Sequence, residues 1–318
     1  MNAPVPNTRF ETACAETDTR TVASLFSGCG GMDLGFVGGF NFLGKTYASL
    51  ANRIIFANDM SEAACRTYQE NLGHDIMAAD IEDAMRQLPR RCDILIGGFP
   101  CQDVSVNGQR QAAQGQRTVL YRKMIEAIRH TRARVFVAEN VRGLLSCEFG
   151  DRVLSDFDLP GYAVTTEVLL ASSYGVPQNR ERLFIVGVRG KRPFKFPERS
   201  VDVPITARAA VSDLEDAPEN SDIKHIWSRA KRSPEQGSRT LKADAPATTM
   251  RAEHHGNVQW HYSLPRRISL REQARFQSFP DNFHFPCAMR ETERQIGNAV
   301  PPVLAWHLAK AIGDQVFA

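Results

Sequence analysis

Short apolar runs separated by amphipathic segments dominate the first 190 residues. Five runs rich in Val, Ile, Leu and Phe occupy residues 21–26, 53–57, 92–96, 134–138 and 182–188. Such near-continuous apolarity is typical of strands that are buried on both faces of a parallel sheet. Between them, residues 61–72 and 119–130 have apolar positions at helical spacing, and Ser61 stands where an N-cap is expected. The pattern predicts an α/β fold, a Rossmann-like and mostly parallel sheet with helices on both faces.

The pattern changes near residue 190. Seven prolines interrupt short polar stretches between residues 193 and 265, and no long hydrophobic period is present. Regular structure returns at Ser269, where Ser-Leu-Arg-Glu is a capping-box pattern that opens a helix, and residues 303–312 predict a last helix. We therefore expect two domains: a larger one from residues 1–190, completed by 294–318, and a smaller irregular one at 191–293.

Composition and charge narrow the class of protein. The 318 residues carry a net charge of +3, but residues 189–267 hold 15 Lys and Arg against 10 Asp and Glu, and the rest holds 24 against 26. This distribution fits a polyanionic partner met through the basic segment, and it equally fits ordinary scatter of surface charge. No stretch approaches about 18 uncharged apolar residues, so no membrane-spanning helix is expected.

The cysteines and the first residues suggest a compartment. Seven cysteines without a Cys-x-x-Cys pair indicate a reducing environment, with neither a disulfide framework nor a structural zinc site. His254, His255 and His261 have no carboxylate or thiol partner at a metal-binding spacing, so no metal is predicted. Residues 1–20 are polar and charged, unlike a secretory signal. A cytoplasmic protein is expected.

A glycine-rich turn follows the first predicted strand. Residues 26–31 read Phe-Ser-Gly-Cys-Gly-Gly, and glycines there let the backbone approach a ligand closely. The turn fits a dinucleotide, another adenosyl cofactor or a purely structural role. Asp59 ends the strand predicted from the second apolar run, where an acid binds ribose hydroxyls in such folds. It comes 31 residues after Gly28, farther than the ~20 of a dinucleotide fingerprint, which disfavours a dehydrogenase.

A cysteine and a glutamate follow two other predicted strands. Cys101 lies in Gly-Gly-Phe-Pro-Cys-Gln (97–102), and Glu139 opens Glu-Asn-Val (139–141). The carboxyl ends of neighbouring parallel strands share one crevice, so a thiol and a carboxyl group would meet there. A nucleophile paired with an acid is an arrangement for covalent catalysis. The alternative for Cys101 is an ordinary buried cysteine.

Two arginines lie at the start of the fifth run. Arg180 and Arg182, in Gln-Asn-Arg-Glu-Arg (178–182), share one face of an extended segment. Such a pair can neutralise a phosphate or orient a carboxylate. A solvated strand end is the alternative.

The order of these motifs resembles the DNA (cytosine-5) methyltransferase family. The four motifs above are followed by Arg-Glu-Gln-Ala-Arg-Phe-Gln-Ser-Phe-Pro-Asp (271–281) and Gln-Ile-Gly-Asn-Ala-Val-Pro-Pro (295–302), and the resemblance runs from about residue 21 to 312. Three departures stand out, one of them Arg117-Thr118 where the family has Arg-Gly. The family usually has Asp where Ser24 stands, and residues 36–53 form a longer connection than its norm.

The resemblance implies a role for individual residues. The catalytic ones would be the nucleophile Cys101, Glu139 as the acid at cytosine N3, and the site arginines Arg180 and Arg182. The S-adenosylmethionine site would be formed by the loop residues Phe26, Gly28, Gly30 and Gly31, by Asp59 at the ribose, and by Met60, Asp80 and Ile81 at the adenine. Asn298 would join the last helix to this pocket.

The resemblance also implies an activity. A monomer would transfer methyl groups from S-adenosylmethionine to C5 of cytosine in a specific short sequence of double-stranded DNA, through a covalent intermediate on a flipped-out base. Bacterial enzymes of this compact form are either partners of a restriction endonuclease that acts on the same site, or solitary methylases. Two alternatives remain: methylation of RNA on the same scaffold, and a non-enzymatic binder that kept the fold.

Overall fold

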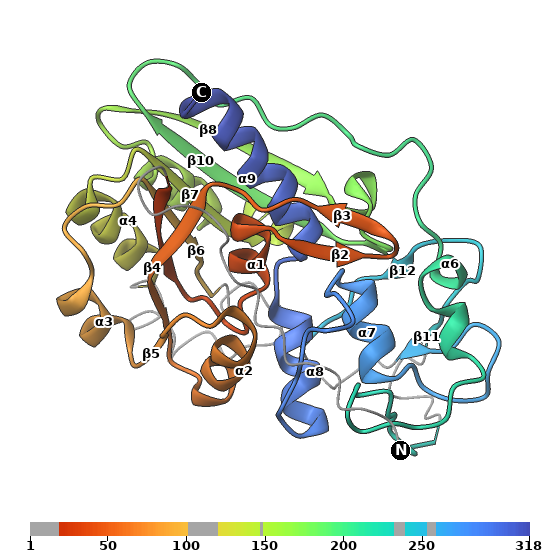
Figure 1. Ribbon diagram of the computed structural model, residues 1–318. Helices are drawn as coiled ribbons and strands as arrows, with labels where there is room; N and C mark the ends of the chain where they lie inside the picture. The colour runs from red at the N-terminus through yellow and green to blue at the C-terminus, as the bar shows by residue number, and fades with distance from the viewer. Residues whose placement is uncertain (1–18, 101–119, 147–148, 232–238, 253–258) are drawn as a thin grey trace.

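A seven-stranded sheet forms the centre of the molecule (Figure 1). The computed structural model describes residues 19–100, 120–146, 149–231, 239–252 and 259–318. The sheet order is β5-β4-β1-β6-β7-β10-β8, and β10 runs antiparallel to both of its neighbours while the other pairings are parallel. The strand bounds are Arg20–Leu25 (β1), Asn52–Asp59 (β4), Met77–Ala78 (β5), Ile94–Gly98 (β6), Val135–Val141 (β7), Tyr162–Leu170 (β8) and Glu181–Arg189 (β10).

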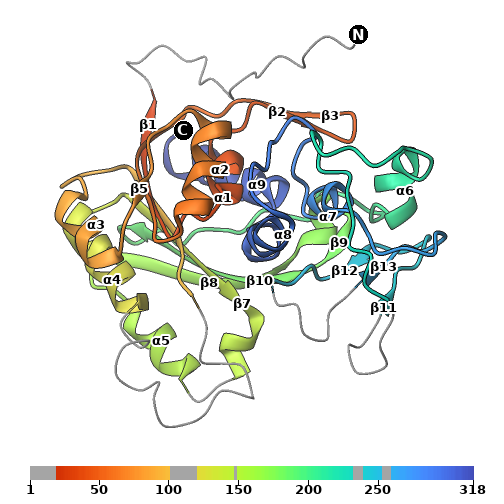
Figure 2. The same cartoon turned by 90° about the horizontal axis from the view of Figure 1, so that it is seen from below.

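Helices cover both faces of the sheet, as Figure 2 shows. Alternate residues of a strand point to opposite faces, so Val22 of β1 joins one hydrophobic cluster while Ala23 joins the other. The helices of the first cluster are α1 (Gly31–Val37), α2 (Glu62–Leu72) and α9 (Pro302–Val316). Those of the second are α3 (Ile81–Gln87), α4 (Leu120–Thr131) and α5 (Gly150–Asp156).

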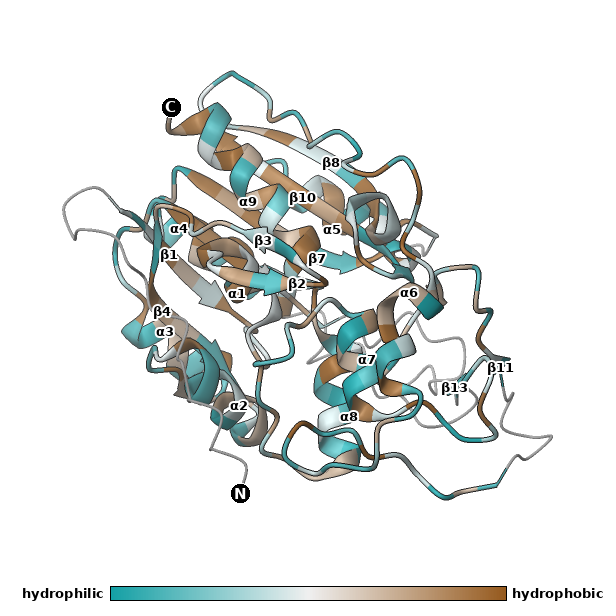
Figure 3. Cartoon of the chain, turned by 45° about the vertical axis from the view of Figure 1, so that its right-hand side comes forward, coloured by the Kyte–Doolittle hydropathy of each residue, from teal (hydrophilic) through white to brown (hydrophobic). Residues whose placement is uncertain are grey.

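The predicted fold class is confirmed, because the five apolar runs are strands of this sheet. Figure 3 shows the sheet strands largely in hydrophobic colours, whereas the surface helix α2 is largely hydrophilic. The side chain of Ser61 caps α2 by accepting a hydrogen bond from the amide of Ala64. Ser269 and Glu272 form the reciprocal capping box at the start of α7 (Leu270–Phe276). No helix in the described part of the chain is long and apolar enough to cross a membrane.

The connection between α1 and β4 is a short hairpin, which accounts for the extra length seen in the sequence. Its strands are β2 (Phe40–Phe42) and β3 (Lys45–Tyr47). The ring of Tyr47 stacks on Phe40 at 5.0 Å and meets the edge of Trp306 at 5.3 Å. The indole of Trp306 donates a hydrogen bond to the carbonyl of Ala48. The hairpin is therefore packed onto α9.

The chain after β10 has little regular structure. A small hydrophobic cluster holds it together, including Val211, Leu241 and Met250. Besides α7, its described elements are α6 (Ala207–Val211), β11 (Arg239–Thr240), β12 (Ala247–Thr248), β13 (Gln259–Trp260) and α8 (Met289–Asn298). Strand β12 pairs with β9 (Gln178–Asn179), while 3-10 helices span Arg142–Ser146, Ala171–Tyr174 and Ser212–Leu214.

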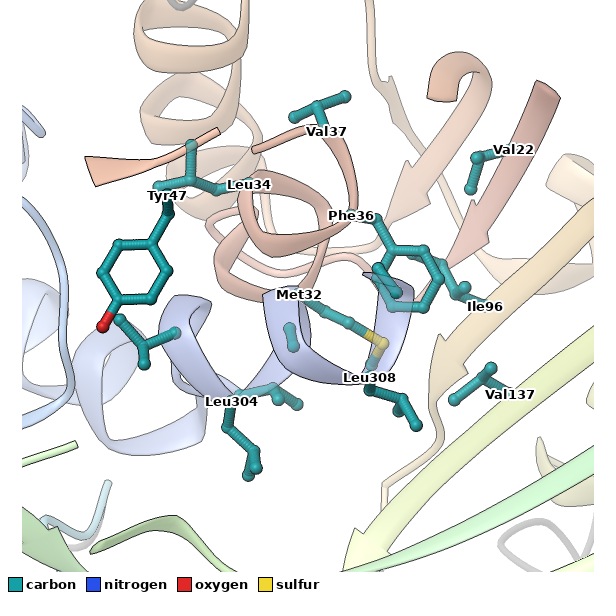
Figure 4. Close-up of a cluster of buried hydrophobic side chains, with 14 of the residues drawn as sticks. Val22, Met32, Leu34, Phe36, Val37, Tyr47, Ile96, Val137, Leu304 and Leu308 are labelled. Atoms are coloured by element: carbon teal, nitrogen blue, oxygen red, sulfur yellow. The ribbon is translucent and has the colours of Figure 1, made fainter. Parts of the chain in front are cut away.

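Helices α1 and α9 pack against each other and share one hydrophobic cluster (Figure 4). A Cβ atom built on Gly35 would lie 2.4 Å from the Cβ of Ala305 and 2.5 Å from the carbonyl oxygen of Pro302. Phe36 and Leu308 are fully buried in the same cluster. Position 35 therefore requires glycine for packing.

We expect Gly35→Ala to lower the free energy of unfolding by about 2 kcal/mol, because the added methyl group forces the two helices apart. Urea unfolding followed by circular dichroism measures this. Gly313→Ala, in α9, is the control: the new Cβ would meet the end of the flexible Arg20 side chain at 2.5 Å. That change should be neutral within about 1 kcal/mol. Equal effects of the two substitutions would contradict the packing argument.

Candidate active site

The candidate site lies where the strand order reverses. Strand β1 pairs with β4 on one side and with β6 on the other. After β1 the chain adds β4 and β5 on the first side, and it then crosses to the other side of β1 to add β6 and β7. Open α/β sheets bind ligands in the crevice at the carboxyl ends of such strands. The glycine-rich loop, Asp59 and Glu139 all lie at these ends.

The glycines of the loop are required for different reasons, either to leave space for a ligand or to allow close packing. Phe26 and Gly28 have φ of +55° and +57°, and Gly30 has φ of +89°. A Cβ on Gly28 would meet nothing within 4 Å, so this side of the loop is open to a ligand. A Cβ on Gly30 would lie 2.5 Å from Leu72, and one on Gly31 would lie 2.5 Å from the carbonyl oxygen of Val300. Those two glycines are required by packing.

Asp59 fixes the loop from the end of β4. Its Oδ2 accepts a hydrogen bond from the amide of Gly28 and its Oδ1 accepts one from Ser61, both at 2.8 Å. Burial raises the pKa of Asp59, although these two bonds oppose the shift. Met60 follows with 76% of its surface exposed, an unusual exposure for an apolar side chain. Asp59 and Met60 thus border the open side of the loop.

Asp80 and Ile81 are brought to the same edge by Asn58. The Asn58 amide donates to the carbonyls of Met77 at 3.0 Å and Ala79 at 2.9 Å, which ties the segment after β5 to the end of β4. Asp80 is exposed and caps α3 through the amide of Glu82. Ile81 is buried in the core. The sequence analysis did not identify Asn58. A polar residue at the end of an otherwise apolar strand was the feature that could have indicated its role.

A second buried carboxyl group lies beneath the loop. Asp33, in the first turn of α1, is fully buried and accepts a hydrogen bond from the Tyr68 hydroxyl at 3.0 Å. Burial raises its pKa to about 6, and the hydroxyls of Ser24 and Tyr68 offset part of that shift. Ser24 stands where the family usually has an acid. Asp33 therefore places a carboxyl group beside that position, which sequence reasoning missed.

Glu139 forms an ion pair inside the crevice. Its Oε1 lies 2.8 Å from Nε of Arg182, and about nine-tenths of each side chain is buried. Burial raises the pKa of Glu139, and the charges of Arg182 and Arg180 counteract only part of this rise. A raised pKa favours the protonated carboxyl group, as a general acid requires.

The chain leading to Cys101 passes next to Glu139. Gly98 of β6 is paired with Glu139 of β7, and a Cβ on Gly98 would be 3.0 Å from the Glu139 carboxylate. The amide of Asn140 donates to the carbonyl of Phe99 at 3.0 Å and so fixes the segment after β6. Cys101 itself lies outside the residues that the structure describes.

Arg180 contacts backbone rather than the Glu139 carboxylate. It is completely buried, and its guanidinium donates to the carbonyls of Met250 at 2.7 Å, Gly297 at 2.8 Å and Ala299 at 3.0 Å. The side-chain Oε1 of Gln178 accepts a further hydrogen bond from the backbone amide of Met250, at 2.7 Å. This cluster joins β9, the segment after β12 and the end of α8. Nothing in the sequence around Arg180 identified these acceptors, because they are backbone atoms far along the chain.

Asn298 ends α8 and is exposed, and the two residues after it, Ala299 and Val300, lie against Gly31 of the glycine loop. The thiol of Cys29 in that loop contacts the carbonyl of Gln295 at 3.8 Å, and the Gln295 side chain accepts from Thr67 of α2 at 2.8 Å. The structure thus brings α8 to the loop. In the described part of the chain, no group of three His, Cys, Asp or Glu residues could hold a metal ion. His254 and His255 lie outside that part.

Several solved structures share this fold. A DNA modification methyltransferase encoded in an E. coli prophage superimposes with a TM-score of 0.73 at 20% identity, covering 94% of this chain and all of the other. The DNMT2 of Spodoptera frugiperda gives a TM-score of 0.66 at 16% identity, over 92% of this chain and 99% of the other. At such identities the likeness concerns the fold.

Sequence comparison identifies the family. The type II methyltransferase M.NgoFVII of Neisseria gonorrhoeae is 34% identical over 331 aligned residues, which cover 92% of this chain and 86% of the relative. M.BsuRI of Bacillus subtilis is 32% identical over 94% of this chain and 80% of the relative. The sequence model of the C-5 cytosine-specific DNA methylases matches residues 20–243 and 220–314. With the crevice described above, this places the chain in that family, as a DNA (cytosine-5) methyltransferase.

Proposed function

We propose that this protein methylates C5 of cytosine within a specific short sequence of duplex DNA, through a covalent bond between Cys101 and C6 of a flipped-out base. The observation that carries the proposal is the buried Glu139–Arg182 ion pair, at 2.8 Å, whose glutamate lies on β7, next to the strand β6 that leads to Cys101. An acid that is held in a crevice beside a nucleophile is what addition to a pyrimidine ring needs.

The residues of the crevice fit S-adenosylmethionine. The open space at Gly28 admits a ligand against the backbone, and Asp59 retains lone pairs for the ribose hydroxyls. The exposed side chain of Met60 offers an apolar surface for the adenine, and Asp80 offers an acceptor for its amino group. Phe26 and Asn298 would complete the pocket. The bound cofactor supplies an electrophilic methyl group.

The chemistry follows from the residues. Cytosine C5 is a weak nucleophile until the Cys101 thiolate bonds to C6, which moves an electron pair toward C5. Transfer of the methyl group to C5 would leave S-adenosylhomocysteine. C5 then loses its proton to solvent water, the electron pair of that C–H bond expels the Cys101 thiolate, and N3 returns its proton to Glu139. The base must leave the duplex for these atoms to be reached, at a cost of a few kcal/mol.

Glu139 stabilises the charge that develops on the ring. Burial raises the pKa of Glu139, so this carboxyl group takes up a proton more readily than an exposed one, and in the protonated form it can donate to N3 as C6 is attacked. Arg182 holds that carboxyl group in place through Nε and supplies positive charge beside the ring. Arg180 does not contact the base in this proposal, because its guanidinium donates to three backbone carbonyls. It acts indirectly, by fixing the segments around the Glu139–Arg182 pair.

We also propose a division of labour along the chain. Residues 1–190 with 294–318 would bind the cofactor and carry the chemistry, and residues 191–293 would recognise the DNA sequence. The separate hydrophobic cluster around Val211 and Leu241 supports this division. The type II names of M.NgoFVII and M.BsuRI support a role in restriction and modification, beside an endonuclease of the same specificity.

The direct test uses the purified protein with radiolabelled S-adenosylmethionine and either duplex DNA or tRNA. We expect label in DNA, and bisulfite sequencing should place it at one sequence context. Cys101→Ser should reduce transfer by at least about 10³-fold and retain cofactor binding, since a hydroxyl is a far weaker nucleophile at neutral pH. Labelling of tRNA alone would favour the RNA alternative. Near-normal transfer by Cys101→Ser would exclude that residue as the nucleophile.

A second test concerns Glu139. Glu139→Gln should slow single-turnover methyl transfer by about 10²- to 10⁴-fold, because an amide cannot give a proton to N3. Glu167→Gln is the matched control: Glu167 is an exposed carboxylate on β8, and Phe184 of β10 pairs with both Glu139 and Glu167. The control should transfer at the native rate. Equal rates for the two variants would rule out proton donation by Glu139.

A further inference from the structure

One arginine beside the candidate active site, Arg251, has its backbone held by two hydrogen bonds on the preceding residue and by close packing against Gly297. The amide and carbonyl of Met250, the residue before Arg251, are bound by Gln178 and Arg180 at 2.7 Å each. On the other side, a Cβ on Gly297 would lie 2.4 Å from the carbonyl carbon of Arg251 and 2.3 Å from the amide of Ala252. The main chain at Arg251 is therefore held between β9 and the end of α8.

The side chain of Arg251 is exposed, unlike those of Arg180 and Arg182. No hydrogen bond or ion pair joins it to any residue in the described ranges. Its charge reaches the site, because repulsion from Arg251 contributes to the lowered pKa of Arg182, after the larger effect of burial. Arg251 thus combines a fixed backbone with an exposed guanidinium near Arg182 that has no partner among the described residues.

Among the described charged side chains that act on Glu139 and Arg182, positive charge exceeds negative charge. Arg180, Arg182 and Arg251 carry three positive charges against the one negative charge that an ionised Glu139 would carry. Arg182 is paired with Glu139 and Arg180 is bound to carbonyls, which leaves the Arg251 guanidinium for an external anion. A DNA substrate brings one phosphate for every nucleotide, and guanidinium groups bind phosphate oxygens well.

We propose that Arg251 binds the phosphodiester next to the target nucleotide and thereby anchors the flipped nucleotide over Glu139. This inference rests on the proposed function, since it assumes that DNA enters this crevice. Thr249 cannot supply the same charge, and its hydroxyl is already bonded to the carbonyl of Asn179 at 2.8 Å. A phosphate contact positions the DNA and adds affinity that does not depend on sequence.

The test measures the affinity of Arg251→Ala for a duplex that contains the methylated sequence, by fluorescence anisotropy across a series of KCl concentrations. Loss of one phosphate contact should weaken binding about tenfold at moderate salt and reduce the slope of log K against log [KCl] by about 1. Arg251→Lys should recover most of the slope. Replacing the adjacent phosphate by an uncharged methylphosphonate should weaken the native protein and leave Arg251→Ala unaffected.

Arg53→Ala is the matched control, because Arg53 is an exposed arginine near the amino end of β4, whereas the candidate site lies at the carboxyl ends of the strands. It should keep the native slope. A native slope in Arg251→Ala would overturn the inference, as would an altered methylated sequence with an unchanged slope, which would indicate contact with a base. Failure of the native protein to methylate any DNA would instead contradict the proposed function.

Discussion

Burying a carboxyl group in an apolar crevice costs several kcal/mol unless a partner compensates for the lost water. Glu139 has one such partner, the Arg182 guanidinium at 2.8 Å, and the two residues come from neighbouring antiparallel strands. The pairing of β7 with β10 is therefore a condition for the site. A shift of one residue would turn Arg182 to the other face of the sheet and leave Glu139 unpaired.

The start of β10 also connects the Glu139–Arg182 pair to the segment after β12 and to the end of α8. Arg180 lies two residues before Arg182, and its bonds to Met250, Gly297 and Ala299 join three distant segments. Because the guanidinium is completely buried, each of these carbonyls replaces water that the charge would otherwise need. A movement of the segment after β12 is thus linked to the position of the Glu139–Arg182 pair. We interpret Arg180 as a positioning residue.

Much of this arrangement could be predicted because it is local or periodic. Buried runs gave the five central strands, and the Ser269 capping box was found at the start of α7. The order of β8 and β10 could not be read in this way, since it depends on which strands meet in space. The partners of Arg180 were hidden for a similar reason: its acceptors are carbonyls 70 to 119 residues away, and any residue type supplies a carbonyl.

The central claim is that Cys101 forms a bond to C6 of the target cytosine and leaves only after C5 loses its proton. A duplex with 5-fluorocytosine at the target has no proton there to lose. In the presence of S-adenosylmethionine, the protein should remain covalently bound to this DNA. Mass spectrometry should place the bond on the peptide that contains Pro100, Cys101 and Gln102. Trapping through another of the seven cysteines, or no trapping despite confirmed binding at the target site, would contradict the account.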